Sequence, residues 1–444
     1  MSRAPVLLVG FAVTNQAVCA QLTERGHPVV ATDDAPEGQA RRQAAAMGVH
    51  LIERPAPQDW PALVADAQVV VPTPGLPEAH SSLGAAAAAE VPVISEFDLA
   101  QRWDARPTLA VTGTNGKTTV TLLAAAMLDA SGIAARVAGN TETPLVEAIR
   151  DDQPAAFVVE ASSFRLGHSR CYRPAVGAWL NFAPDHLDVH ASLDSYRKAK
   201  AAVWSRADEH TTSVVNRDDP VVAAHTPDQG QVVTFGLDEG DFRVSGEALW
   251  GWSEKLADIA ELHRSHPHEL SNQLAAAAVA MAAGANREGV REALLAWTGL
   301  PHRVVLVAEH NGVRFFDDSK ATTPHAVCAA VRSVGQSAGR VVLIAGGRNK
   351  GLELEPMADI TDGLRSVVAI GEAAAEVEEV FVRSRPVVIA ETMEEAIGQA
   401  AAMARSGDAV LLSPGCASFD WYGSYSQRGD HFSRLVHELI GGSP

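Results

Sequence analysis

The residue types best suited to chemistry gather in one glycine-rich stretch, Gly113-Thr114-Asn115-Gly116-Lys117-Thr118-Thr119. An apolar run, 109–111, precedes it, and a segment of helix-forming residues, 120–130, follows it. In a strand–turn–helix unit of this kind, backbone N–H groups and the positive end of the helix face a bound anion. Lys117 could then reach the terminal phosphates of a nucleotide, and the Thr118 hydroxyl could hold Mg²⁺. The loop is a shortened variant, because Val111 stands where the usual pattern has its first glycine, and a glycine-rich turn without a ligand is the alternative.

Polar side chains also follow two other apolar runs. Glu160 ends the run 156–160, and His186 lies shortly after the run 176–181. The carboxyl ends of parallel strands meet at the edge of the sheet where α/β proteins bind ligands. Glu160 is therefore a candidate Mg²⁺ ligand opposite Thr118. A solvated acid is the alternative for Glu160, and a structural histidine is the alternative for His186.

The elements that must position these residues alternate between strand and helix along the whole chain. We expect an α/β protein of three domains: a Rossmann-like parallel sheet in 1–106, a P-loop ATPase-like domain in 107–299 and a Rossmann-like domain in 300–444. The first domain is expected to have strands at 5–10, 27–31, 69–72 and 91–95, with helices at 16–25 and 83–90. The second is expected to have helices at 195–205 and 271–282; the third is expected to have strands at 314–316, 341–345, 367–370, 387–389 and 409–413 and a helix at 324–333.

The first turn of the first domain carries a weak nucleotide signal. Only Gly10 remains of the G-x-G-x-x-G dinucleotide pattern after the first strand. The turn could still take a nucleotide phosphate at its helix start, and Asp33, after the second strand, could meet a ribose hydroxyl. An ordinary strand-to-helix turn explains the same residues equally well.

Composition excludes several classes of protein. The net charge of the 444 residues is −18, which argues against a general nucleic-acid or anionic-membrane surface. No apolar run approaches the roughly 18 residues that a membrane span needs, and the N-terminal segment lacks the pattern of a signal peptide. The four cysteines show no C-x-x-C spacing, so reduced thiols in a cytoplasmic protein are expected.

The joint order of the motifs resembles the Mur ligase family over nearly the whole chain. The segments that carry the resemblance are 113–119, 160–164 (Glu-Ala-Ser-Ser-Phe), 181–188, 300–303 (Leu-Pro-His-Arg), 318–322 (Asp-Ser-Lys-Ala-Thr) and 413–418 (Ser-Pro-Gly-Cys-Ala-Ser). The last three are similar to those of the member that adds D-glutamate, whereas members that add L-alanine or a diamino acid have D-Y-A-H-x-P in place of 318–323. The resemblance implies an ATP-dependent ligase of peptidoglycan precursor synthesis. It would join D-glutamate to UDP-N-acetylmuramoyl-L-alanine through an acyl phosphate, as a cytoplasmic monomer without nucleic-acid or membrane partners.

The resemblance also implies roles for single residues. Those expected to bind ATP are Gly113, Thr114, Asn115, Gly116, Lys117, Thr118, Thr119, Asn272, Arg303 and Asp318. Those expected to hold two Mg²⁺ ions are Thr118, Glu160, His186 and Lys200, and Lys117, Glu160, His186 and Lys200 form the catalytic set. Those expected to bind the UDP-sugar are Val13, Thr14, Asp33, Gly75, Asn140, Ser162 and His186, and those expected to bind glutamate are Lys320, Thr322, Lys350, Ser418 and Tyr425.

Lys200 matches the lysine that the family carries as a carbamate. An ammonium about 4 Å from a dication is opposed by roughly 8 kcal/mol at an effective dielectric near 20, before screening. A carbamate reverses that sign and adds an oxygen ligand. Direct phosphate binding by the free lysine is one alternative, and a solvated helix lysine is the other.

Four residues depart from the family pattern: Glu142, Arg165, Glu269 and Tyr425. They affect the expected shape of the sugar and amino-acid pockets but not the class of reaction. The other functions considered are an L-glutamate-adding muramoyl ligase, a folate-type polyglutamate ligase and a nucleotide-binding regulator without catalysis. The combination of Lys117, Glu160, His186 and Lys200 argues against the regulator.

Overall fold

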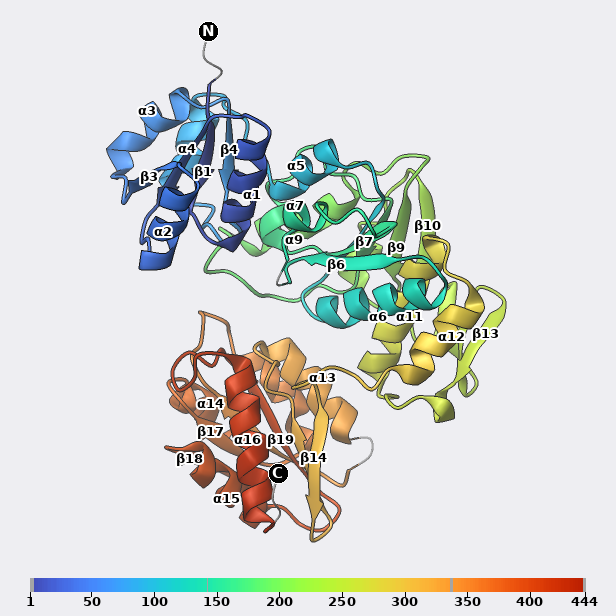
Figure 1. The fold of residues 1–444 in the computed structure, drawn as a ribbon. Coiled ribbons are helices and arrows are strands. Elements are labelled where there is room, and N and C mark those ends of the chain that lie inside the picture. Colours follow the sequence, from blue (N-terminus) through green and yellow to red (C-terminus); the bar gives the residue numbers. More distant parts are fainter. Residues whose placement is uncertain (1–3, 142, 336–337, 442–444) are drawn as a thin grey trace. The chain divides into compact units, whose positions relative to one another are not determined.

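Three β-sheets follow one another along the chain in the computed structural model, which describes residues 4–141, 143–335 and 338–441 (Figure 1). The first two sheets belong to one compact unit, and the third belongs to another. The mixed α/β class expected from the sequence is confirmed. The boundaries of the three expected domains stay predictions.

The first sheet is parallel and has the strand order β3-β2-β1-β4. Its elements are β1 (Val6–Val9), α1 (Val13–Glu24), β2 (Val29–Asp33), α2 (Gly38–Ala46), β3 (His50–Glu53), α3 (Trp60–Ala65), β4 (Val69–Pro72) and α4 (Ser81–Ala88). The strand expected at 91–95 is wrong: this segment makes only an isolated bridge, between Val93 and Val70. Strand β3 was not expected, because it is short and none of its residues is buried: its two outer residues are exposed and its two inner residues are half-buried.

The second sheet has nine strands in the order β13-β12-β11-β10-β9-β8-β5-β7-β6. Its strands are β5 (Thr108–Thr112), β6 (Ala135–Gly139), β7 (Ala156–Glu160), β8 (Val176–Trp179), β9 (Thr212–Asn216), β10 (Gln231–Phe235), β11 (Phe242–Ser245), β12 (Ala248–Gly251) and β13 (Glu254–Asp258). Strands β5 to β10 are parallel, and β11 to β13 form antiparallel pairs that the sequence interpretation did not anticipate.

Helices cover both faces of this second sheet. They are α5 (Glu96–Trp103), α6 (Lys117–Ala130), α7 (Leu145–Ala148), α8 (Ser163–Leu166), α9 (Leu193–Ala201), α10 (Pro220–Ala223), α11 (Pro267–Ala282) and α12 (Arg287–Ala296). Helix α11 therefore begins four residues before the expected start at 271, and α9 ends at Ala201, where a 3₁₀ turn, Ala202–Trp204, continues the chain. The alanines of α11 from Ala275 to Ala280 are fully buried, which confirms that this helix packs closely.

The central strands are buried on both sides because their side chains alternate between two apolar clusters. Leu109 and Val111 of β5 join the cluster that contains α6 and α11, whereas Ala110 joins a cluster on the other face. That second cluster also includes Leu8 and Phe11 of the first sheet region. The first two sheets therefore share apolar packing within one unit.

The third sheet has the strand order β14-β15-β19-β16-β17-β18, with β14 antiparallel to its neighbour and the others parallel. Its strands are β14 (Val305–His310), β15 (Val313–Asp317), β16 (Val341–Gly346), β17 (Leu364–Ile370), β18 (Val387–Ala390) and β19 (Ala409–Gly415). Its helices are α13 (Pro324–Gly335), α14 (Ala374–Phe381), α15 (Met393–Met403) and α16 (Tyr425–Leu439). The five strands expected here are confirmed, and β14 was not expected.

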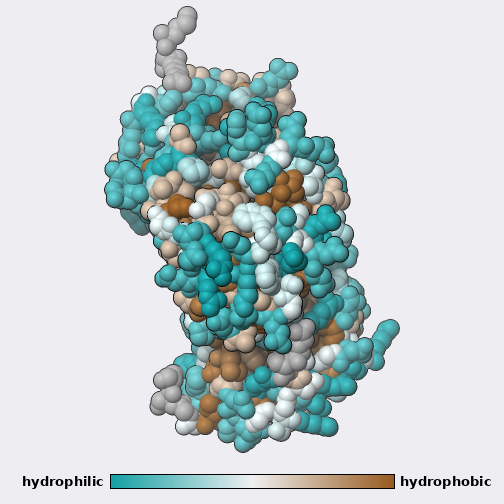
Figure 2. All heavy atoms as spheres, turned by 90° about the vertical axis from the view of Figure 1, so that its right-hand side faces the viewer, coloured by the Kyte–Doolittle hydropathy of each residue, from teal (hydrophilic) through white to brown (hydrophobic). Residues whose placement is uncertain are grey.

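Hydrophilic residues dominate the molecular face drawn in Figure 2, and hydrophobic residues appear there only in small separate groups. Within the described part of the chain, no helix combines the length and the apolar character that crossing a bilayer requires.

The carboxylate of Asp98 on α5 suggests a test of this fold. Buried Asp98 accepts hydrogen bonds from the backbone N–H groups of Ser95, Arg170, Cys171 and Tyr172, at 2.7–3.1 Å. We expect Asp98→Ala to lower the melting temperature by several degrees, because the buried N–H groups of Ser95 and Tyr172 would lose their acceptor, and a buried donor without an acceptor costs about 1–3 kcal/mol. Differential scanning fluorimetry measures the shift. The exposed Asp66→Ala is the matched control, and equal melting temperatures for both variants would contradict this role of Asp98.

Candidate active site

The glycine-rich loop joins β5 to α6 as the sequence predicts. Gly116, immediately before α6, has φ +85°, and a Cβ there would lie 2.4 Å from Oδ1 of Asn272. Only glycine fits this position, since the backbone is left-handed and the space is already filled. Asn272 on α11 consequently lies against the loop, which brings one expected ATP residue beside the others.

Asn181, two residues after the end of β8, forms hydrogen bonds with the backbone of the glycine-rich loop. Its Oδ1 accepts from the Asn115 N–H at 2.9 Å, and its Nδ2 donates to the Asn115 carbonyl at 3.1 Å. Its own carbonyl accepts from the Thr114 N–H at 3.1 Å. The sequence interpretation quoted Asn181 within a motif but gave it no role. The usable signal was an amide two residues beyond β8, which pairs with β5 in the sheet.

Two lysines converge on the carbonyl of Gly113. Lys117 Nζ donates to it at 2.8 Å and to the Thr114 carbonyl at 2.9 Å, while Lys200 Nζ donates to it at 2.7 Å. Lys200 is 1% exposed, so the alternative of a solvated helix lysine is wrong. The Tyr196 hydroxyl lies 3.2 Å from Thr114 Oγ1, and the centre of its ring lies 4.4 Å from Lys200 Nζ.

Glu160 presents a carboxylate to the same edge of the sheet. It ends β7, where it pairs in register with Val111 of β5, and it is 4% exposed. Its Oε1 accepts from Asn140 Nδ2 at 3.1 Å, whereas its buried Oε2 has no hydrogen-bond partner among the described residues. A buried carboxylate oxygen without a partner is costly unless a cation meets it.

The donor set around Glu160 fits magnesium. Thr118 lies in the first turn of α6, directly after the glycine-rich loop 113–116 (the phosphate loop), and Glu160 ends β7, which contacts α6. The described residues contain no group of three or more His, Cys, Asp or Glu side chains arranged for a metal. Mg²⁺ takes one or two protein oxygens and fills its other positions with phosphate and water.

His186 is half-buried, with a left-handed backbone at φ +55°. Its ring centroid lies 4.7 Å from that of Phe164 and 6.2 Å from that of Tyr196. These aromatic contacts hold the imidazole beside α8 and α9. The expected role of His186 in binding a second Mg²⁺ ion stays a prediction.

The residues expected to bind the UDP-sugar come from several loops of the same unit. Val13 is 64% exposed at the start of α1, Thr14 and Ser162 are buried, and Gly75 has φ +86° with open space where a Cβ would stand. Asp33 holds the turn after β1, because its Oδ2 accepts from the Phe11 N–H at 2.8 Å and its Oδ1 from the Ala35 N–H at 2.9 Å. The ribose contact expected for Asp33 stays a prediction beside this structural role.

Buried polar pairs line one end of the third sheet. Asp318 Oδ2 accepts from Ser413 Oγ at 2.7 Å, and burial raises the pKa of Asp318 to about 7. His302 Nδ1 lies 2.6 Å from Asp317 Oδ2, and this hydrogen bond raises the pKa of His302 above its usual value. Arg303, which is expected to bind ATP, lies close enough to Asp318 for its positive charge to lower the pKa of that carboxyl and offset part of the increase that burial causes.

The expected glutamate residues follow the carboxyl ends of β15, β16 and β19. Lys320 Nζ lies 4.9 Å from the centre of the Tyr425 ring, and Lys350 Nζ lies 5.8 Å from that of Phe419. Thr322 is half-buried, and Ser418 is 3% exposed. Their expected glutamate pocket stays a prediction.

The sequence interpretation missed Arg428 on α16. The side chain is buried, and it donates through Nε to Ser319 Oγ at 3.0 Å and through Nη2 to the Ser319 carbonyl at 2.8 Å. Its Nη1 has no hydrogen-bond partner among the described residues. The available signal was a basic residue inside an otherwise amphipathic helix.

Three of the four departures from the family pattern have structural partners, and Glu142 lies outside the described residues. Glu269 Oε1 lies 2.6 Å from Arg264 Nε, and Glu269 Oε2 accepts from the His266 N–H at 3.1 Å. The Tyr425 carbonyl accepts from Ser319 Oγ at 2.8 Å. Arg165 belongs to a larger network, described below.

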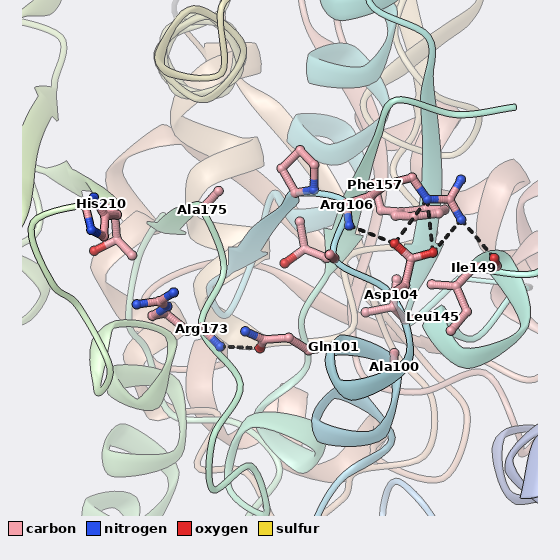
Figure 3. Close-up of a pocket in the computed structure, with 14 residues that line it drawn as sticks. Ala100, Gln101, Asp104, Arg106, Leu145, Ile149, Phe157, Arg173, Ala175 and His210 are labelled. Carbon is pink, nitrogen blue, oxygen red and sulfur yellow. Dashed lines mark hydrogen bonds and ion pairs between the residues drawn. The ribbon is translucent and has the colours of Figure 1, made fainter. Parts of the chain in front are cut away.

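A separate cavity of about 390 Å³ lies at the opposite, amino-terminal ends of β5, β7 and β8 (Figure 3). Arg106 and Asp104 form an ion pair on its wall, at 2.6 Å between Nη2 and Oδ2. This cavity contains none of the residues expected to do chemistry.

Family models match both large parts of the chain. The Mur ligase middle domain matches residues 111–280, and the glutamate ligase domain of Mur ligases matches residues 302–416. The chain belongs to the Mur ligase family, whose members are ATP-dependent amide ligases that use Mg²⁺ and form ADP and phosphate.

Individual relatives and solved structures agree with this family. The UDP-N-acetylmuramoylalanine–D-glutamate ligase of Frankia casuarinae is 39% identical, with 98% of this chain and 94% of the relative covered. The enzyme of the same name from Hahella chejuensis is 34% identical, with 98% of both covered. A pseudomurein peptide ligase type C from Methanothermus fervidus shares the fold with a TM-score of 0.63 at 17% identity, covering 98% of this chain and 100% of that one. The UDP-N-acetylmuramate-alanine ligase of Thermotoga maritima has a TM-score of 0.58 at 18% identity, with the same coverage.

The raised pKa of Asp318 predicts how stability changes with pH. The folded carboxyl keeps its proton up to a pKa of about 7, whereas in the unfolded chain it loses the proton near pH ~4. Between these values only the folded state binds the proton, so stability falls as pH rises and levels off above about 7.

We therefore expect the free energy of unfolding of the wild type, relative to Asp318→Asn, to fall between about pH 4.5 and 7 and to stay constant above about pH 8. Urea unfolding of the full chain, followed by far-UV circular dichroism, measures the difference. Ser333→Ala, another buried polar change in the third domain, controls for general effects. A difference that grows with rising pH would show that Asp318 is ionised in the folded chain.

Proposed function

We propose that the chain is the ATP-dependent ligase that joins D-glutamate to UDP-N-acetylmuramoyl-L-alanine in peptidoglycan precursor synthesis, forming ADP and phosphate. The observation that carries the chemistry is the free buried oxygen of Glu160 beside the phosphate loop and its two lysines. The names of the relatives, at up to 39% identity over nearly the whole chain, support the choice of substrates. We assign the reaction to the cytoplasm, where ATP and nucleotide sugars are found.

The proposed reaction has two steps. The alanyl carboxylate first attacks the γ-phosphorus of ATP, and ADP leaves, so that an acyl phosphate forms. The amine of D-glutamate then attacks the acyl carbon, and phosphate leaves as the amide forms and the amine loses a proton. A carboxylate needs this activation because its own oxygen is a poor leaving group at neutral pH.

The chain's own residues mainly position the anions and offset their charge. Lys117, the loop N–H groups and Asn272 would bind the ATP phosphates, and Asn181 keeps the loop in shape for them. Magnesium held by Glu160 and Thr118 would neutralise charge on the transferred phosphoryl group. Residues 1–106 are expected to bind the UDP-sugar, and residues 300–444 are expected to bind glutamate. Residues 107–299 are expected to bind ATP, together with Arg303 and Asp318.

The carbamate on Lys200 and the second Mg²⁺ near His186 belong to this proposal. A carbamate forms when the free amine of Lys200 adds carbon dioxide, with a new C–N bond and loss of a proton. The buried position of Lys200 against the Gly113 carbonyl would place the new oxygens next to the phosphate loop. The competing assignment is that Lys200 carries no carbamate and binds phosphate directly through its ammonium group. A monomeric state is also expected and has no structural test.

The decisive experiment measures ADP formation by the purified chain with Mg²⁺, ATP and the muramoyl acceptor. We expect ADP to form only when both the acceptor and D-glutamate are present. Equal rates with L-glutamate, or activity with a folate acceptor, would favour the alternative ligases. ATP hydrolysis that never depends on an amino acid would contradict ligase activity altogether.

Lys200→Ala tests the carbamate. We expect the variant to lose activity and to recover part of it with short-chain carboxylic acids, which restore an oxygen ligand. Steady-state ADP release with added acetate or formate measures recovery. Lys198→Ala, an exposed lysine on the same helix, should behave like the wild type with and without the acids. Recovery by short amines would instead assign Lys200 to direct phosphate binding.

Lys350→Ala tests the glutamate pocket. Since glutamate has one carboxylate more than alanine, loss of this cation should raise the KM for glutamate more than tenfold and spare the KM for ATP. Initial rates with each substrate varied in turn give both constants. Lys255→Ala on β13 is a control for the loss of one positive charge. Equal increases in both KM values would place Lys350 outside the glutamate pocket.

A further inference from the structure

Arg165 lies at the centre of a buried hydrogen-bond network in the first unit. The residue is on α8, and its side chain is 6% exposed. Its Nε donates to Glu96 Oε1 at 3.1 Å, its Nη1 to Asn140 Oδ1 at 2.9 Å and its Nη2 to Thr14 Oγ1 at 3.1 Å. One guanidinium therefore joins α1, α5 and the loop after β6 to α8.

The network continues from Asn140 to the expected metal carboxylate. Asn140 Nδ2 donates to Glu160 Oε1 at 3.1 Å, and the Asn140 backbone N–H donates to the Glu160 carbonyl at 2.8 Å. Glu160 Oε2 is the oxygen left without a partner among the described residues. The hydrogen bond from Asn140 thus decides which oxygen of Glu160 stays free.

The direction of this network follows from the donors in arginine. A guanidinium has only N–H groups and no acceptor, so Asn140 must turn its Oδ1 toward Arg165. The Nδ2 group of Asn140 is then left to face Glu160. Since the guanidinium is planar and its Nε is held by Glu96, the Asn140 amide that contacts Nη1 has little freedom to rotate.

We infer that Arg165 is a positioning residue that fixes the Asn140 amide and, through it, the Glu160 carboxylate that faces the metal. Through its hydrogen bond to Thr14, Arg165 also fixes the position of a residue that is expected to bind the UDP-sugar. This inference rests on the proposed metal role of Glu160 and assigns to Arg165 no contact with the reacting atoms.

Glu96 provides a way to separate positioning from stability. Its side chain is 1% exposed, and its Oε2 also accepts from the Val146 N–H at 3.1 Å. Removing Arg165 alone would leave a buried carboxylate without its cation, which is strongly destabilising. Arg165→Lys keeps the charge but lacks the fork, and the pair Glu96→Gln/Arg165→Met removes both charges together.

The test is Mn²⁺ binding in the presence of ADP, followed by the electron paramagnetic resonance signal of free Mn²⁺. We expect the dissociation constant for Mn²⁺ to rise at least fivefold in Arg165→Lys and in the pair Glu96→Gln/Arg165→Met. We expect the pair variant to melt within a few degrees of the wild type. In steady-state assays the KM for the UDP-sugar should rise, while the KM for glutamate stays unchanged.

The pair Asp104→Asn/Arg106→Met is the control, because it removes another, more exposed arginine–carboxylate ion pair at the opposite ends of the strands of the same sheet (Figure 3). It should bind Mn²⁺ as the wild type does. Glu160→Gln must lose Mn²⁺ binding in the same assay; unchanged binding there would remove the proposed metal role and this inference with it. Loss in Glu160→Gln together with unchanged binding in both Arg165 variants would overturn the positioning role alone.

Discussion

The carboxylate of Glu160 imposes the central constraint on this structure. It is 4% exposed at the end of a strand, and only one of its oxygens has a hydrogen-bond partner among the described residues. Removing a charged oxygen from water costs several kcal/mol unless another charge offsets it. In the proposed function, a divalent cation bound with nucleotide phosphates would supply that charge.

The phosphate loop is held in shape by its neighbours as well as by its own glycines. Asn181 meets the loop backbone at three points, and Asn272 fills the space that a side chain at Gly116 would need. Lys117 and Lys200 meet at the Gly113 carbonyl. This concentration of positive charge lies in a chain of net charge −18, so the proposed anion binding would depend on local placement of charge and not on overall charge.

In the third domain, burial raises the pKa of a carboxyl group. Asp318 has a pKa of about 7 because burial penalises its charge more than Ser413 and Arg303 stabilise it. Nearby, Asp317 is hydrogen-bonded to His302. Arg428 donates hydrogen bonds to both the hydroxyl and the backbone carbonyl of Ser319. These buried polar contacts give the carboxyl ends of β15 and β19 a defined shape, on which the proposed amino-acid pocket would depend.

The sequence by itself determined the α/β class, the phosphate loop, the strand ends that carry Glu160 and Asp318, and the family. These features are encoded locally, by apolar runs of strand length and by residues at fixed spacing next to them. It could not show that 91–95 forms only one bridge or that 50–53 pairs as a strand, because both depend on neighbouring strands distant in sequence. Only the tertiary structure decided that Lys200 is buried, that Asn181 clamps the loop, and that Arg165 joins Thr14, Glu96 and Asn140. Their partners are tens of residues away or more, and no local pattern specifies a hydrogen bond over that separation.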